Sequence, residues 1–272
     1  MTEITVATFN AGLLDGFIPH SRGRAGPVAA ALGALDADLV ALQEIWSEGD
    51  RRLVAETTPL GHVIGADPLE GDVTGFALDG TTGIMLLSRW PLLATSAVEL
   101  PSYFTRRAVI VAEVDVPGGP VTVLATHLAA NIRNVEHRDP GGWKGEHRTH
   151  VLEVLRLAAE ASGPVLLAGD LNCGPERRDG FTEFAANYDL LRSGFETSAY
   201  ADDPASTCTW CPDNPLNPFA GATILDHVME SGFRPLAWRR ILDEIVEVDG
   251  DDGPVETTLS DHYGVAVTLA LD

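Results

Sequence analysis

Segments with the apolar patterning of β-strands recur along almost the whole chain of 272 residues, with few helical segments between them. Alternating or continuous apolar runs predict strands at Ile4–Phe9, Leu39–Leu42, Thr82–Ser88, Ala108–Val116, Val121–Thr126, Pro164–Ala168, Ala222–Met229 and Gly264–Leu271. Apolar residues at helical spacing predict helices over Gly26–Leu35 and His147–Glu160. This pattern is typical of an α/β (α+β) protein in which helices cover the outer faces of mixed sheets.

The charge balance restricts the classes of partner. The chain carries 18 basic and 40 acidic side chains, a net charge of −22. A protein that binds a long nucleic acid or an anionic membrane surface needs a basic face, so the composition argues against both partners. The sequence has no apolar run long enough for a membrane span, and MTEITVATFN at its start does not resemble a signal peptide. We therefore expect a cytoplasmic protein with one domain over residues 1–272.

Short polar signatures follow or precede many of the predicted strands, where active sites of α/β proteins collect. They contain Asn10, Gln43-Glu44, Thr126-His127, Gly169-Asp170-Leu171-Asn172, Leu225-Asp226-His227 and Ser260-Asp261-His262. Each signature alone is commonly a turn or a solvated strand end. Their combination supplies all the groups that a metal-dependent phosphoryl-transfer site needs.

The side chains of Asn10, Glu44 and Asp261 offer hard oxygen ligands. Such ligands favour Mg²⁺, or Mn²⁺, over zinc. A hard cation with few protein ligands keeps open positions for a phosphoryl oxygen and stabilises the charge that develops on it. We expect these residues to hold the metal.

Two histidines are the candidates for proton transfer and phosphate contact, because imidazole titrates near neutrality. We predict that His262 is the base, with Asp226 fixing its tautomer, and that His127 contacts the phosphate. Asp170 and Asn172 are expected to position the water and the phosphate.

A pair of arginines, Arg106-Arg107, precedes one predicted strand. Arg107 is the candidate for a bidentate contact to a substrate phosphate. The alternative, an exposed pair leading into the strand, is equally compatible with the sequence.

This ordered set of signatures resembles the endonuclease/exonuclease/phosphatase (DNase I-like) superfamily from Asn10 to His262. The resemblance implies a four-layer α/β sandwich with two central mixed β-sheets and a site at one edge. It also implies the roles assigned above: Glu44 as the principal metal ligand with Asn10 and Asp261 nearby, and Asp226–His262 as the base.

Several segments look most like the neutral sphingomyelinase branch of this superfamily, namely Gln43-Glu44-Ile45-Trp46, Ser88-Arg89-Trp90-Pro91, Thr209–Leu216 and Ser260–Val265. This likeness implies cleavage of the phospholipase C type, in which a phosphodiester gives a phosphomonoester and an alcohol. The leading hypothesis is therefore an Mg²⁺-dependent phosphoesterase acting on a small-molecule or lipid-like phosphoester. A nuclease of the same fold and a non-catalytic binding protein are the alternatives.

Two further groups of residues have more than one interpretation. Cys208 and Cys211 form a C-x-x-C motif, compatible with half of a zinc site or with a redox pair. Because no second pair of thiols is present, we expect ordinary loop residues there. His137, His147 and His150 flank a Gly-rich turn at 140–142, and we expect a solvated loop rather than a second metal site.

Overall fold

The computed structural model describes residues 2–65, 81–132, 135–176, 182–217, 221–250 and 252–271. Three loops that the sequence suggests for substrate selection, 66–82, 129–146 and 199–221, lie partly outside these residues.

The first sheet has six strands in the order β10-β13-β1-β2-β4-β3. These strands are β1 (Thr2–Leu13), β2 (Leu39–Ile45), β3 (His62–Gly65), β4 (Met85–Ser88), β10 (Arg234–Ile241) and β13 (Gly264–Leu271). β1 runs parallel to β2 and antiparallel to β13, so the sheet is mixed.

The second sheet has five strands in the order β5-β6-β7-β8-β9. These strands are β5 (Leu92–Leu100), β6 (Arg107–Val116), β7 (Gly119–His127), β8 (Val165–Asp170) and β9 (Asp226–Ser231). Only β7 and β8 pair in parallel, which places their carboxyl ends side by side. β11 (Ile245–Gly250) and β12 (Gly253–Thr258) form a separate hairpin.

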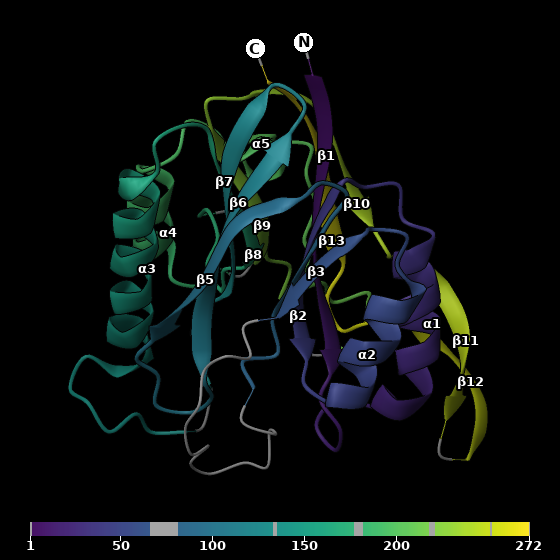
Figure 1. Cartoon of the computed structure of the whole chain (residues 1–272). Helices are drawn as coiled ribbons and strands as arrows, with labels where there is room; N and C mark the ends of the chain where they lie inside the picture. Colours follow the sequence, from purple (N-terminus) through teal and green to yellow (C-terminus); the bar gives the residue numbers. More distant parts are fainter. Residues whose placement is uncertain are drawn as a thin grey trace.

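Helices cover the outer faces of both sheets (Figure 1). α1 (Ser21–Gly33) and α2 (Glu48–Thr57) lie on the six-stranded sheet, and α3 (Gly142–Glu160) and α4 (Ala185–Arg192) lie on the five-stranded sheet. The short α5 (Ala199–Asp202) precedes β9. The order helix, sheet, sheet, helix confirms the four-layer sandwich.

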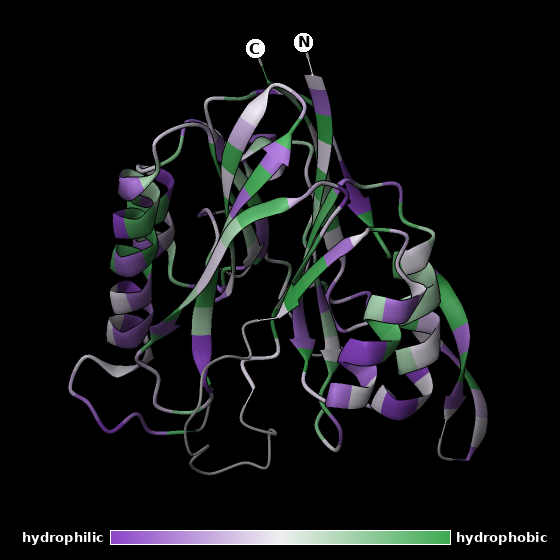
Figure 2. Ribbon diagram, viewed as in Figure 1, coloured by the Kyte–Doolittle hydropathy of each residue, from purple (hydrophilic) through white to green (hydrophobic). Residues whose placement is uncertain are grey.

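Three apolar clusters hold the layers together, one between the sheets and one beneath each helical layer. The central cluster joins Val6 and Val267 of the first sheet to Ile110, Val123 and Leu166 of the second. The inner strands of both sheets are therefore apolar on both faces, and Figure 2 shows hydrophobic stretches along the strands and a mixture of hydrophobic and hydrophilic residues on the helices. Continuous apolar runs are expected of strands buried on both faces.

The predicted strands with continuous apolar runs are confirmed, but elements with more polar sequences are missing from the prediction. The strands β5 and β10 and the helices α2 and α4 belong to this group. The strand predicted over Ala222–Met229 begins only at Asp226, because Thr223 pairs with Trp210 instead of extending β9.

No helix in the described part of the chain has the length and apolarity needed to cross a membrane.

The buried carboxyl of Glu230 on β9 makes the stability of the fold depend on pH. Burial, and then the nearby carboxylate of Asp202, raise its pKa from 4.5 to about 8. A carboxyl whose pKa is raised on folding stabilises fully below its unfolded pKa, and this contribution is lost as the pH rises through the folded value. Glu230→Gln removes the titration. We expect the free energy of unfolding of the native protein, relative to this variant, to fall by about a few kcal/mol from about pH 4.5 to pH 8.

Urea denaturation of both proteins across this range measures the difference. A constant difference between the native protein and the variant would contradict the predicted titration of Glu230.

Candidate active site

Three predicted site residues are neighbours across adjacent strands of the second sheet. His127 ends β7, Asp170 ends β8 and Asp226 begins β9. The strand register pairs His127 with Asp170, and Asp170 with Asp226. Hydrogen bonding between the strands therefore sets the spacing of these side chains.

The first sheet contributes Asn10 and Glu44 to the same place. Asn10 lies near the end of β1 and pairs with Gln43 of β2, which precedes Glu44. Asn10 Nδ2 donates to Glu44 Oε1 at 3.3 Å and to Asp170 Oδ2 at 2.9 Å. The Asn10 amide thus joins the two sheets at this edge.

The loop between β12 and β13 brings in His262 and Asp261. His262 Nδ1 lies 2.9 Å from Asp226 Oδ2, and His262 Nε2 lies 3.9 Å from Asp170 Oδ2. Asp261 lies beside the end of β1, since a Cβ on Gly12 would be 2.6 Å from Asp261 Oδ1. The predicted pairing of Asp226 with His262 is thus present.

Asn172 lies in the turn after β8. Its backbone N–H donates to Asp170 Oδ1 at 3.0 Å, and its side-chain Nδ2 donates to the carbonyl of Leu128 at 3.0 Å. Two buried histidines contact carbonyls of the same turn: His147 Nε2 lies 2.8 Å from Leu171 O, and His227 Nε2 lies 2.8 Å from Cys173 O. Burial lowers the pKa of both histidines to about 4, so both are neutral donors to these carbonyls.

This packing corrects the expectation of a solvated loop at His147 and His150. Both residues are fully buried on α3. His150 Nε2 contacts Pro101 O at 2.7 Å, and its Nδ1 accepts the backbone N–H of Ala129. His137 contacts Glu146 Oε2 at 2.8 Å.

The charges around the site are strongly coupled. Burial alone lowers the pKa of His262, but the carboxylates of Asp226 and Asp170 raise it well above its ordinary value. Burial and then the Arg107 guanidinium lower the pKa of His127. Burial alone raises the pKa of Asp170, yet the two histidines hold it below its ordinary value.

Five of the predicted site residues line a cavity of about 310 Å³: Glu44, His127, Asp170, Asn172 and His262. Its wall includes Arg107, whose residue is only 7% exposed, so the exposed-pair alternative for this arginine is wrong. Arg107 Nε and Nη1 have no hydrogen-bond partner within the part of the chain that the structure describes. The cavity wall also includes Asn131 and Glu183, which the sequence did not single out, and Trp210 of the Thr209–Leu216 segment.

Arg24 is a further residue that sequence reasoning missed. It is fully buried on α1 and donates to the carbonyls of Ala11, Gly12 and Leu259 at 3.0, 2.5 and 2.6 Å. It therefore fastens the end of β1 to the loop that carries Asp261. Only its buried contacts reveal it, since an arginine in a helix has no distinctive sequence signal.

The oxygen donors of the site fit a hard divalent cation. Glu44 and Asp261 lie close enough for Glu44 to raise the pKa of Asp261, in addition to the larger effect of burial. A cation between such carboxylates offsets their repulsion, and oxygen ligands suit Mg²⁺. The atoms of Asp170, Asp226 and His262 also lie within 4.8 Å of one another, but there the bond between His262 and Asp226 already uses two of the three ligands.

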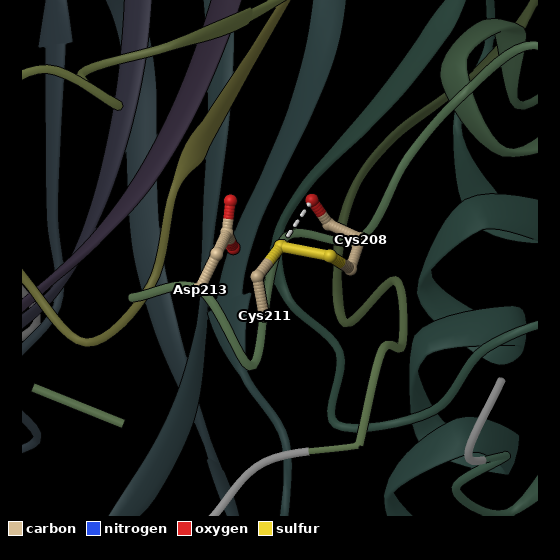
Figure 3. A group of neighbouring side chains, drawn as sticks. All are labelled: Cys208, Cys211 and Asp213. Atoms are coloured by element: carbon tan, nitrogen blue, oxygen red, sulfur yellow. Dashed lines mark hydrogen bonds between the residues drawn. A yellow bond between two sulfur atoms is a disulfide. The ribbon is translucent and has the colours of Figure 1, made fainter. Parts of the chain in front are cut away.

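The C-x-x-C motif is neither an ordinary pair of loop residues nor half of a zinc site. Cys208 and Cys211 are joined by a disulfide next to Asp213 (Figure 3). Zinc ligation requires thiolates, which the disulfide does not offer. The expectation for these two cysteines is therefore wrong, because the tight turn brings the two sulfurs together.

Comparison with known proteins agrees with this architecture. The model of the endonuclease/exonuclease/phosphatase family matches residues 7–262. No curated protein sequence matches the chain.

Solved structures share the fold at low sequence identity. Sphingomyelinase C from Streptomyces griseocarneus is 19% identical, with a TM-score of 0.69 over 98% of this chain and 99% of that one. D. rerio TDP2 complexed with a single-strand DNA product is 18% identical, with a TM-score of 0.74 over 99% and 100%. An endonuclease/exonuclease/phosphatase from Beutenbergia cavernae is 24% identical, with a TM-score of 0.66 over 99% of this chain and 72% of that one. Identities this low establish the fold alone.

The buried contacts of Arg24 predict a large loss of stability when its guanidinium is removed. Arg24→Met leaves several buried carbonyls without a donor, so we expect the free energy of unfolding to fall by about 3–5 kcal/mol. Arg22→Met is the matched control on the same helix, because Arg22 is exposed and bonds only to the surface carboxylate of Asp15. The control is expected to lose less than about 1 kcal/mol. Equal losses of unfolding free energy in urea denaturation would show that Arg24 does not hold the end of β1 to the loop that carries Asp261.

Proposed function

The chain belongs to the endonuclease/exonuclease/phosphatase family, and from that premise we propose that it is a divalent-metal-dependent phosphoesterase. The proposed reaction is hydrolysis of a P–O bond in a small organic or lipid-like phosphoester. The observation on which this rests is the buried His262–Asp226 pair, with 2.9 Å between His262 Nδ1 and Asp226 Oδ2, at the wall of the cavity that Arg107 also lines.

The His262–Asp226 pair supplies the base. Asp226 accepts the hydrogen bond of the Nδ1–H group, and Nε2 faces the cavity. Because the carboxylates raise the pKa of His262, Nε2 accepts a proton from water only in the deprotonated form of the imidazole. Asp170, 3.9 Å from His262 Nε2, accepts a hydrogen bond from that water and orients it. The protonated His262 is then stabilised by the same two carboxylates.

The phosphate is held by donors that line the same cavity. Arg107 offers the N–H groups of Nε and Nη1, each for a hydrogen bond to a phosphate oxygen. Burial keeps His127 neutral with its proton on Nε2, 3.3 Å from Asp170 Oδ2, and this N–H and the Asn172 amide are further donors at the wall. Together these groups orient the phosphorus toward the water.

Glu44, Asn10 and Asp261 would hold the metal, with Glu44 as principal ligand. Mg²⁺ or Mn²⁺ bound there supplies positive charge to a phosphoryl oxygen as its negative charge increases. Arg24 holds the end of β1, after Asn10, next to the loop that carries Asp261 through its bonds to carbonyls of both segments.

The walls of the cavity favour a substrate with a single phosphate. Asn131 Nδ2 donates to Glu183 Oε1 at 2.9 Å, which places a carboxylate at the wall. That carboxylate repels a second phosphate, and the net charge of −22 repels a polyanion. Both effects favour a small or lipid-like phosphoester over a nucleic acid strand.

The proposed roles predict that loss of the base or of the principal ligand abolishes turnover. We expect His262→Ala and Glu44→Gln to lower kcat/KM on bis(4-nitrophenyl) phosphate by about a thousandfold or more. EDTA is expected to remove the activity, and excess Mg²⁺ or Mn²⁺ to restore it.

Glu48→Gln is the matched control, because Glu48 is exposed on α2 and pairs only with Arg52. It is expected to keep the native rate. Full activity in EDTA, or native rates in both site variants, would rule out the proposed reaction.

A substrate panel separates the proposed phosphoesterase from a nuclease of the same fold. We expect turnover of at least one substrate among sphingomyelin, lysophospholipids, nucleotides and sugar or inositol phosphates. Supercoiled plasmid and an abasic oligonucleotide are expected to be cut at least about tenfold more slowly, because the acidic surface repels them. Rapid nicking of the plasmid would favour the nuclease instead.

A further inference from the structure

The disulfide Cys208–Cys211 closes a short turn next to the Asp226–His262 pair. Thr209 and Trp210 lie between the two cysteines, and Thr209 is fully buried. Trp210 lines the cavity that contains His262. The disulfide, drawn in Figure 3, thus closes the turn that carries both residues.

Thr209 binds the backbone beside both members of the pair. Its Oγ1 accepts the N–H of Leu225 at 2.9 Å and the N–H of Asp226 at 3.2 Å. Its carbonyl accepts the N–H of Tyr263, the residue after His262, at 2.8 Å. One residue therefore sets the backbone of Asp226 and of the His262 loop relative to each other.

The neighbouring residues fasten the turn to the segment before β9. The N–H groups of Thr209 and Trp210 donate to the carbonyl of Thr223 at 2.9 and 3.1 Å, and the N–H of Thr223 donates to Trp210 O at 3.1 Å. On the outer side the Arg240 guanidinium lies 4.4 Å from the Tyr263 ring centroid and bonds to Cys208 O.

We propose that Thr209 is a positioning residue for the Asp226–His262 pair, and that the Cys208–Cys211 disulfide holds it in place. Reduction of the disulfide therefore lowers turnover without changing any group that contacts the substrate phosphate. This inference rests on the proposed function, in which the pair activates water.

The partial exposure of Cys208 permits the reduction. Cys208 is partly exposed, whereas Cys211 is buried. A thiolate of a dithiol reductant attacks Cys208 Sγ, the S–S bond breaks, and Cys211 leaves as a thiolate that takes up a proton. The second thiol of the reductant then displaces Cys208 and forms a cyclic disulfide. Two electrons and two protons pass from the dithiol to the protein.

The first test removes the Thr209 hydroxyl. We expect Thr209→Val to lower kcat about 10- to 100-fold with KM nearly unchanged, because the base is misplaced while the phosphate contacts remain. Thr209→Ser keeps the hydroxyl and is expected to restore kcat to within about threefold of native. Thr95→Val on the exposed face of β5 is the control and is expected to leave kcat unchanged. Equal kcat in native protein and Thr209→Val would overturn the inference.

The second test uses the disulfide. We expect dithiothreitol, with Mg²⁺ in excess, to lower native kcat about 3- to 10-fold. The double variant Cys208→Ser/Cys211→Ser is expected to show the lowered rate already and not to respond to dithiothreitol. An equal response of native protein and double variant would assign the effect to another cause and contradict the inference.

Amide hydrogen exchange distinguishes this inference from the proposed function. Thr209→Val is expected to speed exchange at Leu225 and Asp226 but not at Tyr263, whose acceptor is the Thr209 carbonyl. Reduction is expected to speed exchange at all three amides. If no phosphoester is turned over, the proposed function fails while exchange still tests the positioning. If exchange at these amides is insensitive to both changes, the positioning role is wrong even in an active enzyme.

Discussion

The site depends on the buried carboxylate of Asp170, where the two sheets meet. Its Oδ2 accepts a hydrogen bond from Asn10 of the first sheet, and its Oδ1 accepts one from the Asn172 backbone of the second. An ionised carboxylate in the interior costs several kcal/mol unless donors surround it. Moving the two sheets apart would therefore remove donors from the carboxylate and leave its burial uncompensated. The apolar cluster between the sheets brings the layers together, and this hydrogen bonding fixes how their edges are aligned.

The two buried arginines of the site, Arg24 and Arg107, differ in their hydrogen-bond partners. Every nitrogen of Arg24 donates to a main-chain carbonyl, and these bonds hold the end of β1 and the loop that carries Asp261. Arg107 Nε and Nη1 lack such partners among the described residues and lie at the cavity wall. A buried guanidinium with unused donors is costly without an anion. In the proposed function a substrate phosphate would supply that anion for Arg107, whereas Arg24 already has carbonyl partners for all its nitrogens.

The sequence predicts the inner strands well because they are buried on both faces. Val165–Asp170 and Leu39–Ile45 are nearly continuous apolar runs, which few other structures accommodate. The strand β5 is mostly exposed along Leu92–Leu100, so its period is weak and the pattern does not reveal it. The polar residues that end the inner strands are also predictable, since register alone brings His127, Asp170 and Asp226 together.

Residues that act through main-chain contacts escape prediction. Arg24 donates to the carbonyls of Ala11 and Leu259, which lie more than 200 residues apart in the sequence. His147 and His227 bond to carbonyls of the turn after β8, and nothing in their local sequence indicates this. The pairing of Cys208 with Cys211 follows from a turn whose shape is set by Thr223 and Tyr263. In each case contacts to backbone groups position the side chains, and backbone groups are the same whichever residue stands in the sequence.

The architecture separates the groups to which we assign the reaction from those to which we assign substrate selection. Asn10, His127 and Asp170 lie on strands whose register the cores fix, whereas Asn131 and Glu183 of the cavity wall lie on loops. Loops can change without disturbing a rigid sheet, which fits a fold shared at below 25% identity by a sphingomyelinase and by TDP2 bound to a DNA product. The turn at Cys208–Cys211 belongs to both parts, because Trp210 contributes to the wall while Thr209 holds the backbone of Asp226.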